Sequence, residues 1–324
     1  MGKYATIIHD FSPKENHPQV DFLQKKPNAM KKTSTEQKII LLGEWKFAGG
    51  AGESGNNGNS GFSLEPFPRM CYDRHGSVNS MEQFSRTISL VGQEAFDRVH
   101  RARVAVFGVG GVGGYVCEAL VRSGIAEIDL FDRDDVSISN LNRQIIALHS
   151  TIGQDKVDAM AARLKDINPD VRVNCRKMFY LPATADEVDL SVYDFVVDAV
   201  DTIAAKLELA RRCEQSGIRF ISSMGAGNKL DPSCLRIADI TKTSVCPLAR
   251  AMRVSCKKKG IRHMTVAYSL EPMHPPVQPI AEESGRRKDI PGSTAFVPGA
   301  MGLLIASHVV RTLMAGDEPA RPEG

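Results

Sequence analysis

The stretch RVAVFGVGGVGGYVCEALVRSG, residues 103–124, decides the fold. Residues 103–108 are mainly apolar, with β-branched and aromatic side chains, and predict a buried strand, and 112–123 have the apolar periodicity of a helix that ends before Gly124. The glycines between them let the backbone approach a phosphate at the positive end of the helix. The glycines that we assign to nucleotide binding are Gly108, Gly110, Gly111 and Gly113.

Short apolar runs and amphipathic segments continue to alternate after residue 124. Strands are predicted at 127–132, 171–176, 193–200 and 218–224, and helices at 154–167 and 204–215. This alternation is typical of a doubly wound α/β domain with a mostly parallel, Rossmann-like sheet. We therefore expect a Rossmann-like nucleotide-binding domain over residues 81–240.

The remaining part, residues 241–324, contains further elements of the same kind. Strand-like segments at 234–240 and 263–270 flank a helical stretch at 247–259, and a proline-rich loop at 272–291 precedes a closing helix. No linker composition separates this part from the preceding domain. We therefore expect a C-terminal extension on the same sheet rather than a free domain.

Residues 1–80 differ in texture from the rest of the chain. The segment GGAGESGNNGNSG at 49–61 is of low complexity, and Met81 looks like a natural beginning. We expect residues 1–80 to be mostly disordered.

The composition excludes several classes of protein. Of 324 residues, 42% are hydrophobic and 24% charged, which excludes a fibrous or wholly disordered chain, and the net charge of +3 is too small to indicate nucleic acid or membrane by itself. The seven cysteines include no CxxC pair, so neither a disulfide framework nor a zinc ribbon is indicated. The longest apolar run, 300–310, is interrupted by His308 and predicts a buried helix rather than a membrane span. We expect a cytoplasmic protein that does not associate with membranes.

Charged side chains follow the glycine turn in a definite order. Asp132 comes about 20 residues after the turn, where a carboxylate accepts hydrogen bonds from ribose hydroxyls. Up to this point a nicotinamide-dependent dehydrogenase and an ATP-using enzyme fit equally well. Arg143 and Lys156 favour an adenylating enzyme, because attack on the α-phosphate of ATP builds negative charge on phosphoryl oxygens. Asp201, after the strand at 193–200, supplies a carboxylate suited to Mg²⁺.

Four motifs in this order resemble the ATP-binding core of the ubiquitin-activating-like adenylyltransferases, the superfamily of ThiF, MoeB and HesA. They are GxGGxG at 108–113, DxDxVxxSNxNRQ at 132–144, GxxK at 153–156 and DxxD at 198–201.

The resemblance implies a role for each matching residue. Asp132 would hold the ribose of ATP and Asp201 would bind Mg²⁺. The residues that would contact the phosphates are Asn140, Arg143, Gln144 and Lys156, and the implied catalytic set is Asn140, Arg143, Lys156 and Asp201. In homodimers of this superfamily an arginine near the N-terminus reaches the ATP of the neighbouring subunit, and Arg86 in the sequence FSRT matches it.

Three features distinguish branches of the superfamily. Enzymes that adenylate the sulfur carriers of molybdopterin and thiamine usually have two CxxC pairs, and eukaryotic-type enzymes carry a thioester cysteine domain; this chain lacks the first and has no room for the second. Segments 86–96, 132–148, 222–233, 238–250 and 290–303 resemble instead the bacterial branch that dehydrates threonylcarbamoyladenosine in tRNA. The resemblance covers about residues 81–315.

This branch implies an ATP-driven cyclisation at position 37 of tRNA. The side-chain carboxylate of the modified nucleoside is adenylated, pyrophosphate leaves, and the adjacent carbamoyl group attacks and expels AMP. Because the nucleophile is tethered to the activated carbonyl, the enzyme needs mainly to orient it. No catalytic cysteine is required, and we expect a non-catalytic role for Cys246.

A basic segment gives independent support for an RNA partner. Residues 242–262 contain seven lysines and arginines and no acidic residue, and Arg286, Arg287 and Lys288 form a second run. Alternatively, such a run is a solvated helix face.

Three other functions remain open at this stage. An adenylyltransferase would activate the C-terminal Gly-Gly of a small sulfur-carrier protein, and a sulfur-relay or acceptor protein is a further conceivable partner. A non-catalytic nucleotide- or RNA-binding module and a nicotinamide oxidoreductase are the remaining classes.

Overall fold

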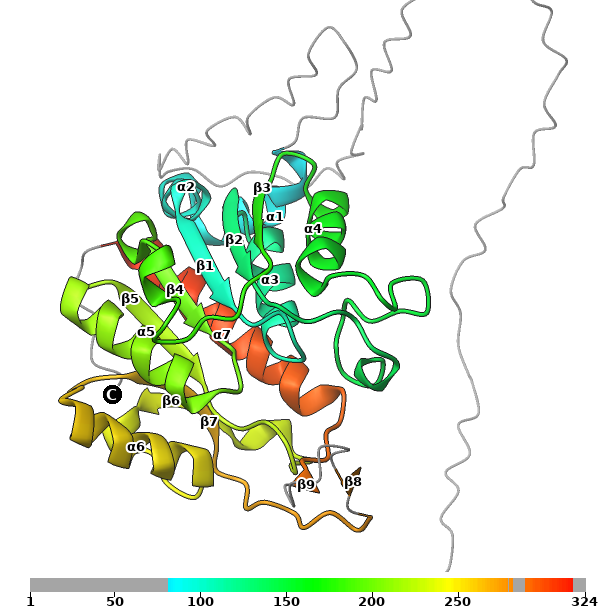
Figure 1. Cartoon of the computed structure of the whole chain (residues 1–324). Helices are drawn as coiled ribbons and strands as arrows, with labels where there is room; N and C mark the ends of the chain where they lie inside the picture. Colours follow the sequence, from blue (N-terminus) through cyan, green and yellow to red (C-terminus); the bar gives the residue numbers. More distant parts are fainter. Residues whose placement is uncertain (1–80, 279, 282–288, 317–324) are drawn as a thin grey trace, which may run out of the picture. The chain divides into compact units, whose positions relative to one another are not determined.

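A seven-stranded sheet forms the centre of the part of the chain that the computed structural model describes, residues 81–278, 280–281 and 289–316 (Figure 1). In chain order its strands are β1 (Arg103–Phe107), β2 (Glu127–Phe131), β3 (Arg172–Arg176), β4 (Phe195–Asp198), β5 (Arg219–Ser223), β6 (Leu235–Asp239) and β7 (Thr265–Ser269). A small separate sheet pairs β8 (Ile280–Ala281) with β9 (Asp289–Ile290). The predicted disorder of residues 1–80 concerns residues outside the described ones.

The strands lie in the order β3-β2-β1-β4-β5-β7-β6. Every neighbouring pair is parallel except β6 and β7, which are antiparallel. The predicted doubly wound, mostly parallel sheet with C-terminal strands added to it is therefore confirmed.

Seven α-helices accompany the sheet in the described residues. They are α1 (Ser85–Val91), α2 (Gln93–Arg101), α3 (Gly113–Arg122), α4 (Lys156–Ile167), α5 (Ile203–Ser216), α6 (Pro247–Lys259) and α7 (Phe296–Ala315). The pair α1 and α2 was not predicted as helical. Gly92, with φ of +82°, separates the two short helices, and Phe84 packs on Phe96 with ring centroids 5.2 Å apart.

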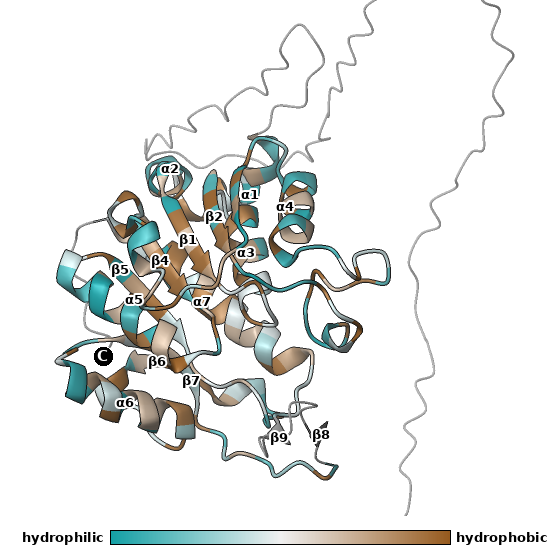
Figure 2. Ribbon diagram, in the orientation of Figure 1, coloured by the Kyte–Doolittle hydropathy of each residue, from teal (hydrophilic) through white to brown (hydrophobic). Residues whose placement is uncertain are grey.

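Alternate residues of β1 face the two sides of the sheet. Val104 and Val106 pack in the cluster formed with α3, α4 and α7, whereas Ala105 and Phe107 pack on the side covered by α5. Figure 2 shows the strands as hydrophobic and the outer helix faces as hydrophilic. Burial on both faces explains why the central strands read as apolar runs rather than alternating patterns.

β4 and α4 are among the elements that are shorter than predicted. β4 ends at Asp198, because the Asp198 carboxylate accepts a hydrogen bond from the Val200 N–H and turns the chain. α4 begins at Lys156 rather than at Gln154, because the backbone of Gln154 and Lys156 is hydrogen-bonded to the loop that follows β2.

The closing helix α7 is long and apolar enough to cross a membrane by length and composition alone. It packs instead against α3, so closely that a Cβ on Gly302 would lie 2.5 Å from the carbonyl oxygen of Val112. Met301, Ile305 and Val309 are fully buried. α7 is therefore a core helix of this fold, as predicted.

Candidate nucleotide-binding site

The glycine turn lies where the order of the strands reverses. β1 lies between β2 and β4, and in open α/β sheets ligands bind at the carboxyl ends of the strands at such a switch point. Gly108, with φ of +89°, directly follows β1, and α3 begins at Gly113. The sequence therefore places the turn at the position that this fold uses for phosphates.

The four predicted glycines differ in their surroundings. A Cβ on Gly113 would lie 1.8 Å from the carbonyl oxygen of Gly108, and a Cβ on Gly108 would lie 2.6 Å from that of Ala199. These two glycines are required by the packing of the turn itself. Gly110 and Gly111 have more room, and their nearest neighbours are Gln144 Nε2 at 3.8 Å and Arg143 Cγ at 3.3 Å.

Asp132 connects the turn to the end of β2. One of its carboxylate oxygens accepts a hydrogen bond from the Val109 N–H at 2.7 Å, and the other accepts one from the Asp134 N–H at 2.9 Å. The carboxylate is thus fixed beside the turn, and each oxygen retains a lone pair that can accept a hydrogen bond from a hydroxyl group.

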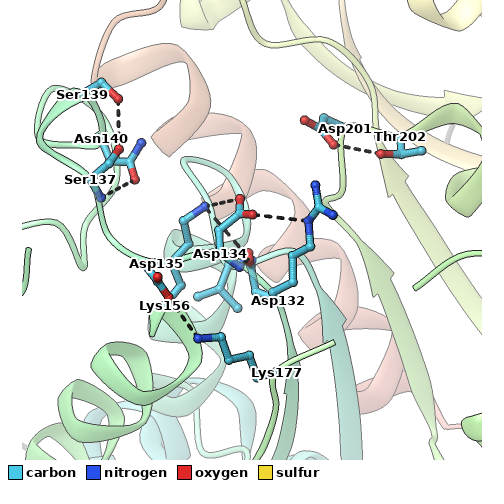
Figure 3. A network of polar contacts seen from close by, with 12 residues as sticks. Asp132, Asp134, Asp135, Ser137, Ser139, Asn140, Lys156, Lys177, Asp201 and Thr202 are labelled. Atoms are coloured by element: carbon cyan, nitrogen blue, oxygen red, sulfur yellow. Dashed lines mark hydrogen bonds and ion pairs between the residues drawn. The ribbon is translucent and has the colours of Figure 1, made fainter. Parts of the chain in front are cut away.

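A cavity of about 440 Å³ adjoins Asp132. It is lined by Arg133, Asp134, Asp135, Ser137, Asn140 and Lys156. Figure 3 shows that these side chains come from the loop after β2 and from the start of α4. The predicted residues Asn140 and Lys156 therefore lie together.

Lys156 is the central cation of this cavity. Its side chain is only 8% exposed, and its ammonium nitrogen lies 2.9 Å from Asp134 Oδ2 and 4.0 Å from Asp132 Oδ1 (Figure 3). The Lys156 N–H also donates to the carbonyl of Asp134. A phosphate in the cavity could exchange with Asp134 as the partner of the ammonium group.

Asn140 holds the far side of the cavity. It ends the short 3₁₀ turn η2 (Ile138–Asn140), and its side-chain oxygen accepts a hydrogen bond from the Ser137 N–H at 3.1 Å. The side chain is buried and fixes the loop after β2. From this position the Asn140 side chain can contact a phosphate. It also has a structural role, because it holds the loop after β2 in place.

Arg143 and Gln144 lie beside the inner glycines of the turn. The Arg143 guanidinium donates to the carbonyl of Ser139 and to Asn142 Oδ1, and burial lowers the pKa of Arg143 below its ordinary value. Gln144 is 6% exposed, and its Oε1 has no hydrogen-bond partner among the described residues. An unpaired buried oxygen of this kind is costly unless a hydrogen-bond donor satisfies it, whereas the amide nitrogen of the same side chain can donate to a phosphate.

Asp201 lies on the other side of the switch point. It follows β4, is exposed, and accepts a hydrogen bond from the Thr202 hydroxyl at 3.1 Å, apart from the Lys156 network (Figure 3). Asp198, the first residue of the same motif, is fully buried and paired with Lys206. Only Asp201 is therefore available to a ligand.

The described residues contain no ready-made metal site, that is, no group of three or more His, Cys, Asp or Glu side chains that could hold an ion. In ATP-using enzymes Mg²⁺ is usually bound through one or two carboxylates together with substrate phosphates, so that chemistry does not require such a cluster. The hard oxygen donors of the exposed Asp201 carboxylate fit that chemistry.

Arg86 does not join the site within one subunit. It is exposed on α1, and α1 and α2 precede β1, so they lie toward the amino ends of the strands. Arg86 is also absent from the lining of the cavity.

Cys246 is buried at the start of α6, with 3% of its surface exposed. An inaccessible thiol agrees with the predicted non-catalytic role.

Several site residues were not singled out from the sequence. Asp134 pairs with Lys156, and Arg133 lies with its guanidinium carbon 3.9 Å from the centre of the Phe179 ring. Asp135 pairs with Lys177. The run DRDD, which begins at the last residue of the predicted strand 127–132, is the signal that could have identified Asp134 and Arg133.

The chain is similar to proteins of known function over most of its length. Residues 84–323 match the ThiF family. A tRNA threonylcarbamoyladenosine dehydratase of Bacillus subtilis (strain 168) is 43% identical over 255 residues, which cover 74% of this chain and 98% of that protein. The corresponding dehydratase of Escherichia coli (strain K12) is 32% identical over 252 residues, 72% of this chain and 94% of the relative.

Solved structures agree with this similarity. The crystal structure of E. coli tRNA N6-threonylcarbamoyladenosine dehydratase, TcdA, in complex with AMP matches with a TM-score of 0.66 and 32% identity, covering 72% of this chain and 95% of that one. The complex of the same enzyme with ATP matches with a TM-score of 0.64. From the family match, the identity to relatives covered almost completely, and the shared fold, we conclude that the chain belongs to the ThiF family.

Proposed function

We propose that this protein uses ATP to dehydrate threonylcarbamoyladenosine at position 37 of tRNA, forming a cyclic product with release of AMP and pyrophosphate. The observation that carries the proposal is the cavity lined by Lys156, whose ammonium group lies 4.0 Å from Asp132, the carboxylate that is hydrogen-bonded to the glycine turn. The chain also aligns with 98% of a relative that is named for this dehydration.

The reaction divides into two steps whose atoms balance. The substrate carboxylate attacks the α-phosphorus of ATP, an O–P bond forms, and pyrophosphate leaves. An atom of the neighbouring carbamoyl group then attacks the activated carbonyl and loses a proton, and AMP leaves with the former carboxylate oxygen. The sum is loss of one water from the nucleoside and cleavage of ATP to AMP and pyrophosphate.

The charges at the site suit the first step. Negative charge accumulates on phosphoryl oxygens as the carboxylate attacks, and fixed cations stabilise it more than they stabilise the ground state. Lys156 is held at the cavity by Asp134, and Arg143 lies beside Gly111. In our proposal both cations bind phosphate oxygens.

The neighbouring polar groups orient the nucleotide. Asp132, held by two backbone N–H groups, accepts hydrogen bonds from the ribose hydroxyls. Asn140 and Gln144 donate amide N–H groups to the phosphates. The backbone of Gly110 and Gly111 follows the phosphate chain at the N-terminus of α3.

Mg²⁺ is the metal that we propose for this site, with Asp201 as its protein ligand. The bound ion would neutralise charge on the phosphates of ATP. Asp201 suits this role because its carboxylate is exposed at the carboxyl end of β4.

The tethered nucleophile makes few demands on the second step. An intramolecular reaction of correctly oriented groups needs no covalent intermediate with the enzyme. The buried Cys246 is consistent with such a mechanism, and a sulfur-relay partner would find no accessible thiol there.

We further propose a cytoplasmic homodimer in which Arg86 serves the ATP site of the other subunit. Its exposure on α1 and its absence from the cavity of its own subunit support this assignment.

The C-terminal extension, residues 241–324, is the proposed tRNA-facing part. α6 begins near the carboxyl edge of the sheet, where a Cβ on Gly225 would lie 3.9 Å from Leu248, and it ends near Glu214 in the last turn of α5. Its exposed basic residues are Arg250, Lys257, Lys258 and Lys259, followed by Arg262. Exposed cations gathered at the end of a helix suit the phosphates of a folded RNA.

The test is ATP consumption by the purified protein with and without tRNA that carries threonylcarbamoyladenosine. We expect AMP and pyrophosphate only with modified tRNA, and a loss of about 18 Da from the nucleoside, the mass of one water expelled by the intramolecular cyclisation. Unchanged tRNA would contradict the proposal. Pyrophosphate release triggered by a carrier protein with a C-terminal Gly-Gly would support the alternative adenylyltransferase instead.

A further inference from the structure

Lys206 is a fully buried lysine near the nucleotide site. Lys206 lies in the first turn of α5, and its side chain is 1% exposed. It follows eight residues after Asp198, whose carboxylate is at the end of β4. Both burial and the positive end of a helix disfavour a cation in this position. Its presence there requires strong compensating contacts.

The compensation comes from the ends of β4 and β5. The Lys206 ammonium nitrogen lies 3.3 and 3.2 Å from the two carboxylate oxygens of Asp198 and donates to the carbonyl of Ser223 at 2.7 Å. Asp198 also accepts from the Ser222 hydroxyl at 2.6 Å. Lys206 thus joins α5 to two neighbouring strands at their carboxyl ends.

The same contacts fix the turn that leads to Asp201. The Val200 N–H donates to Asp198 at 3.1 Å, and the Ala199 N–H donates to the carbonyl of Phe107, the last residue of β1, at 2.7 Å. The Ala199 carbonyl then lies so close to Gly108 that no side chain fits there. The turn at 199–200 is therefore packed directly against the glycine turn.

Stability alone does not account for a buried ion pair at this point. Replacing such a pair by apolar residues of similar volume is often neutral or stabilising, so a buried ion pair is weak evidence for a stabilising role. Here the ion pair fixes the relative position of two turns that both face the nucleotide site.

We propose that Lys206 is a positioning residue for ATP binding, acting through Asp198. It holds the turn at 199–200 against Gly108, and so sets the distance between Asp201 and the glycine turn. This inference rests on the proposed function, because it assumes that both turns contact the same ATP molecule.

The test compares Lys206→Met with a matched control, Arg103→Met. Arg103 pairs with Asp129, a carboxylate as deeply buried as Asp198, but it lies at the amino end of β1, away from the cavity. For Lys206→Met we expect the dissociation constant of ATP in calorimetry and the KM for ATP to rise about tenfold or more, the size of effect seen when positioning is disturbed. Arg103→Met should change the urea midpoint but leave both ATP constants within a factor of about two, because it lies away from the site.

The double variant Asp198→Asn/Lys206→Met is a control for the case in which Lys206→Met does not fold. It removes both charges, so we expect the urea midpoint to recover while the dissociation constant of ATP stays raised. ATP binding like that of the unsubstituted protein, in either Lys206 variant, would overturn the proposal. Failure of the unsubstituted protein to bind ATP or to convert modified tRNA would instead overturn the proposed function.

Discussion

The ammonium group of Lys156 and the carboxylate of Asp134 form an ion pair of 2.9 Å in the lining of the cavity. Lys156 is buried, whereas the Asp134 side chain is 55% exposed. The pair is thus asymmetric, with the cation held in place and the anion free to move toward solvent. A phosphate that enters the cavity can replace Asp134 at little cost in buried charge.

This asymmetry predicts different effects for the two partners. Lys156→Ala should lower turnover on the order of 10²-fold or more, because it removes a fixed cation from the charged transition state. Asp134→Asn should lower it less than about tenfold, because the exposed Asp134 carboxylate contributes little by itself and is replaced by phosphate when ATP binds. Steady-state kinetics with modified tRNA measure both, and equal losses would contradict the exchange of partners.

Arg143 should be as important as Lys156 for the phosphate chemistry. We expect Arg143→Ala to reduce turnover on the order of 10²-fold or more while the circular dichroism spectrum and the unfolding midpoint stay close to those of the unsubstituted protein. Near-normal activity of a folded Arg143→Ala protein would refute the assigned phosphate contact. Asn142→Ala, which removes one hydrogen-bond partner of the guanidinium, is a milder comparison.

Substitutions at two glycines of the turn should have different effects, one on folding and the other on ATP binding. Gly113→Ala places a Cβ 1.8 Å from a backbone oxygen, and we expect a poorly folded or insoluble protein. Gly110→Ala meets nothing closer than 3.8 Å, so it should fold normally but bind ATP more weakly. Thermal unfolding and calorimetry test the pair, and a normal melting curve for Gly113→Ala would be inconsistent with the packing described.

The basic end of α6 should affect tRNA and leave ATP binding unchanged. Substituting Lys257, Lys258 and Lys259 by Gln should raise the KM for modified tRNA. The slope of the logarithm of the tRNA binding constant against the logarithm of the salt concentration should become less steep, by roughly one unit for each phosphate that the variant no longer neutralises. The KM for ATP should not change. An unaltered salt slope would show that this run is only a solvated helix face.

The lowered pKa of Glu271 predicts that part of the protein's folding stability is lost in acid. Burial alone would raise its pKa, but hydrogen bonds from the backbone N–H groups of Leu230 and Asp231 and from His274 hold the pKa below its ordinary value of 4.5. A carboxyl group whose pKa is lowered by folding stabilises the protein above its unfolded pKa, and this stability is lost as the pH falls through the folded value. We expect Glu271→Gln to be less stable than the unsubstituted protein at pH 7 and the difference to shrink below about pH 4.5. Urea titrations across this range measure it, and a difference independent of pH would exclude the linkage.

The central α/β units could be predicted from the sequence because their signals are local. The apolar run at β1, the glycines and the start of α3 adjoin one another in the sequence. α6 begins and ends at the predicted residues, since a proline is its first residue and a glycine follows its last one. The antiparallel direction of β6 could not be predicted, since pairing with β7 depends on residues far apart in the chain.

The same distinction applies to the site. Asp132, Asn140 and Lys156 lie in short motifs, so the sequence alone could single them out as candidates. In the structure Asn140 and Lys156 line the cavity, and Asp132 lies 4.0 Å from the Lys156 ammonium group. The contact of Arg133 with Phe179 and the ion pair of Lys206 with Asp198 depend on tertiary packing. No local pattern distinguishes Lys206 from a lysine on a solvated helix face.

The packing of α7 against α3 also has a consequence for how the protein is made. α7 is synthesised after every other described element, yet it packs on the helix that begins at the glycine turn, with Gly302 against Val112 and Gly299 against Tyr115. While the ribosome is still producing residues 296–315, one face of α3 lacks its covering. A nascent chain should therefore acquire its ability to retain nucleotide late in translation, after the ribosome tunnel has released α7.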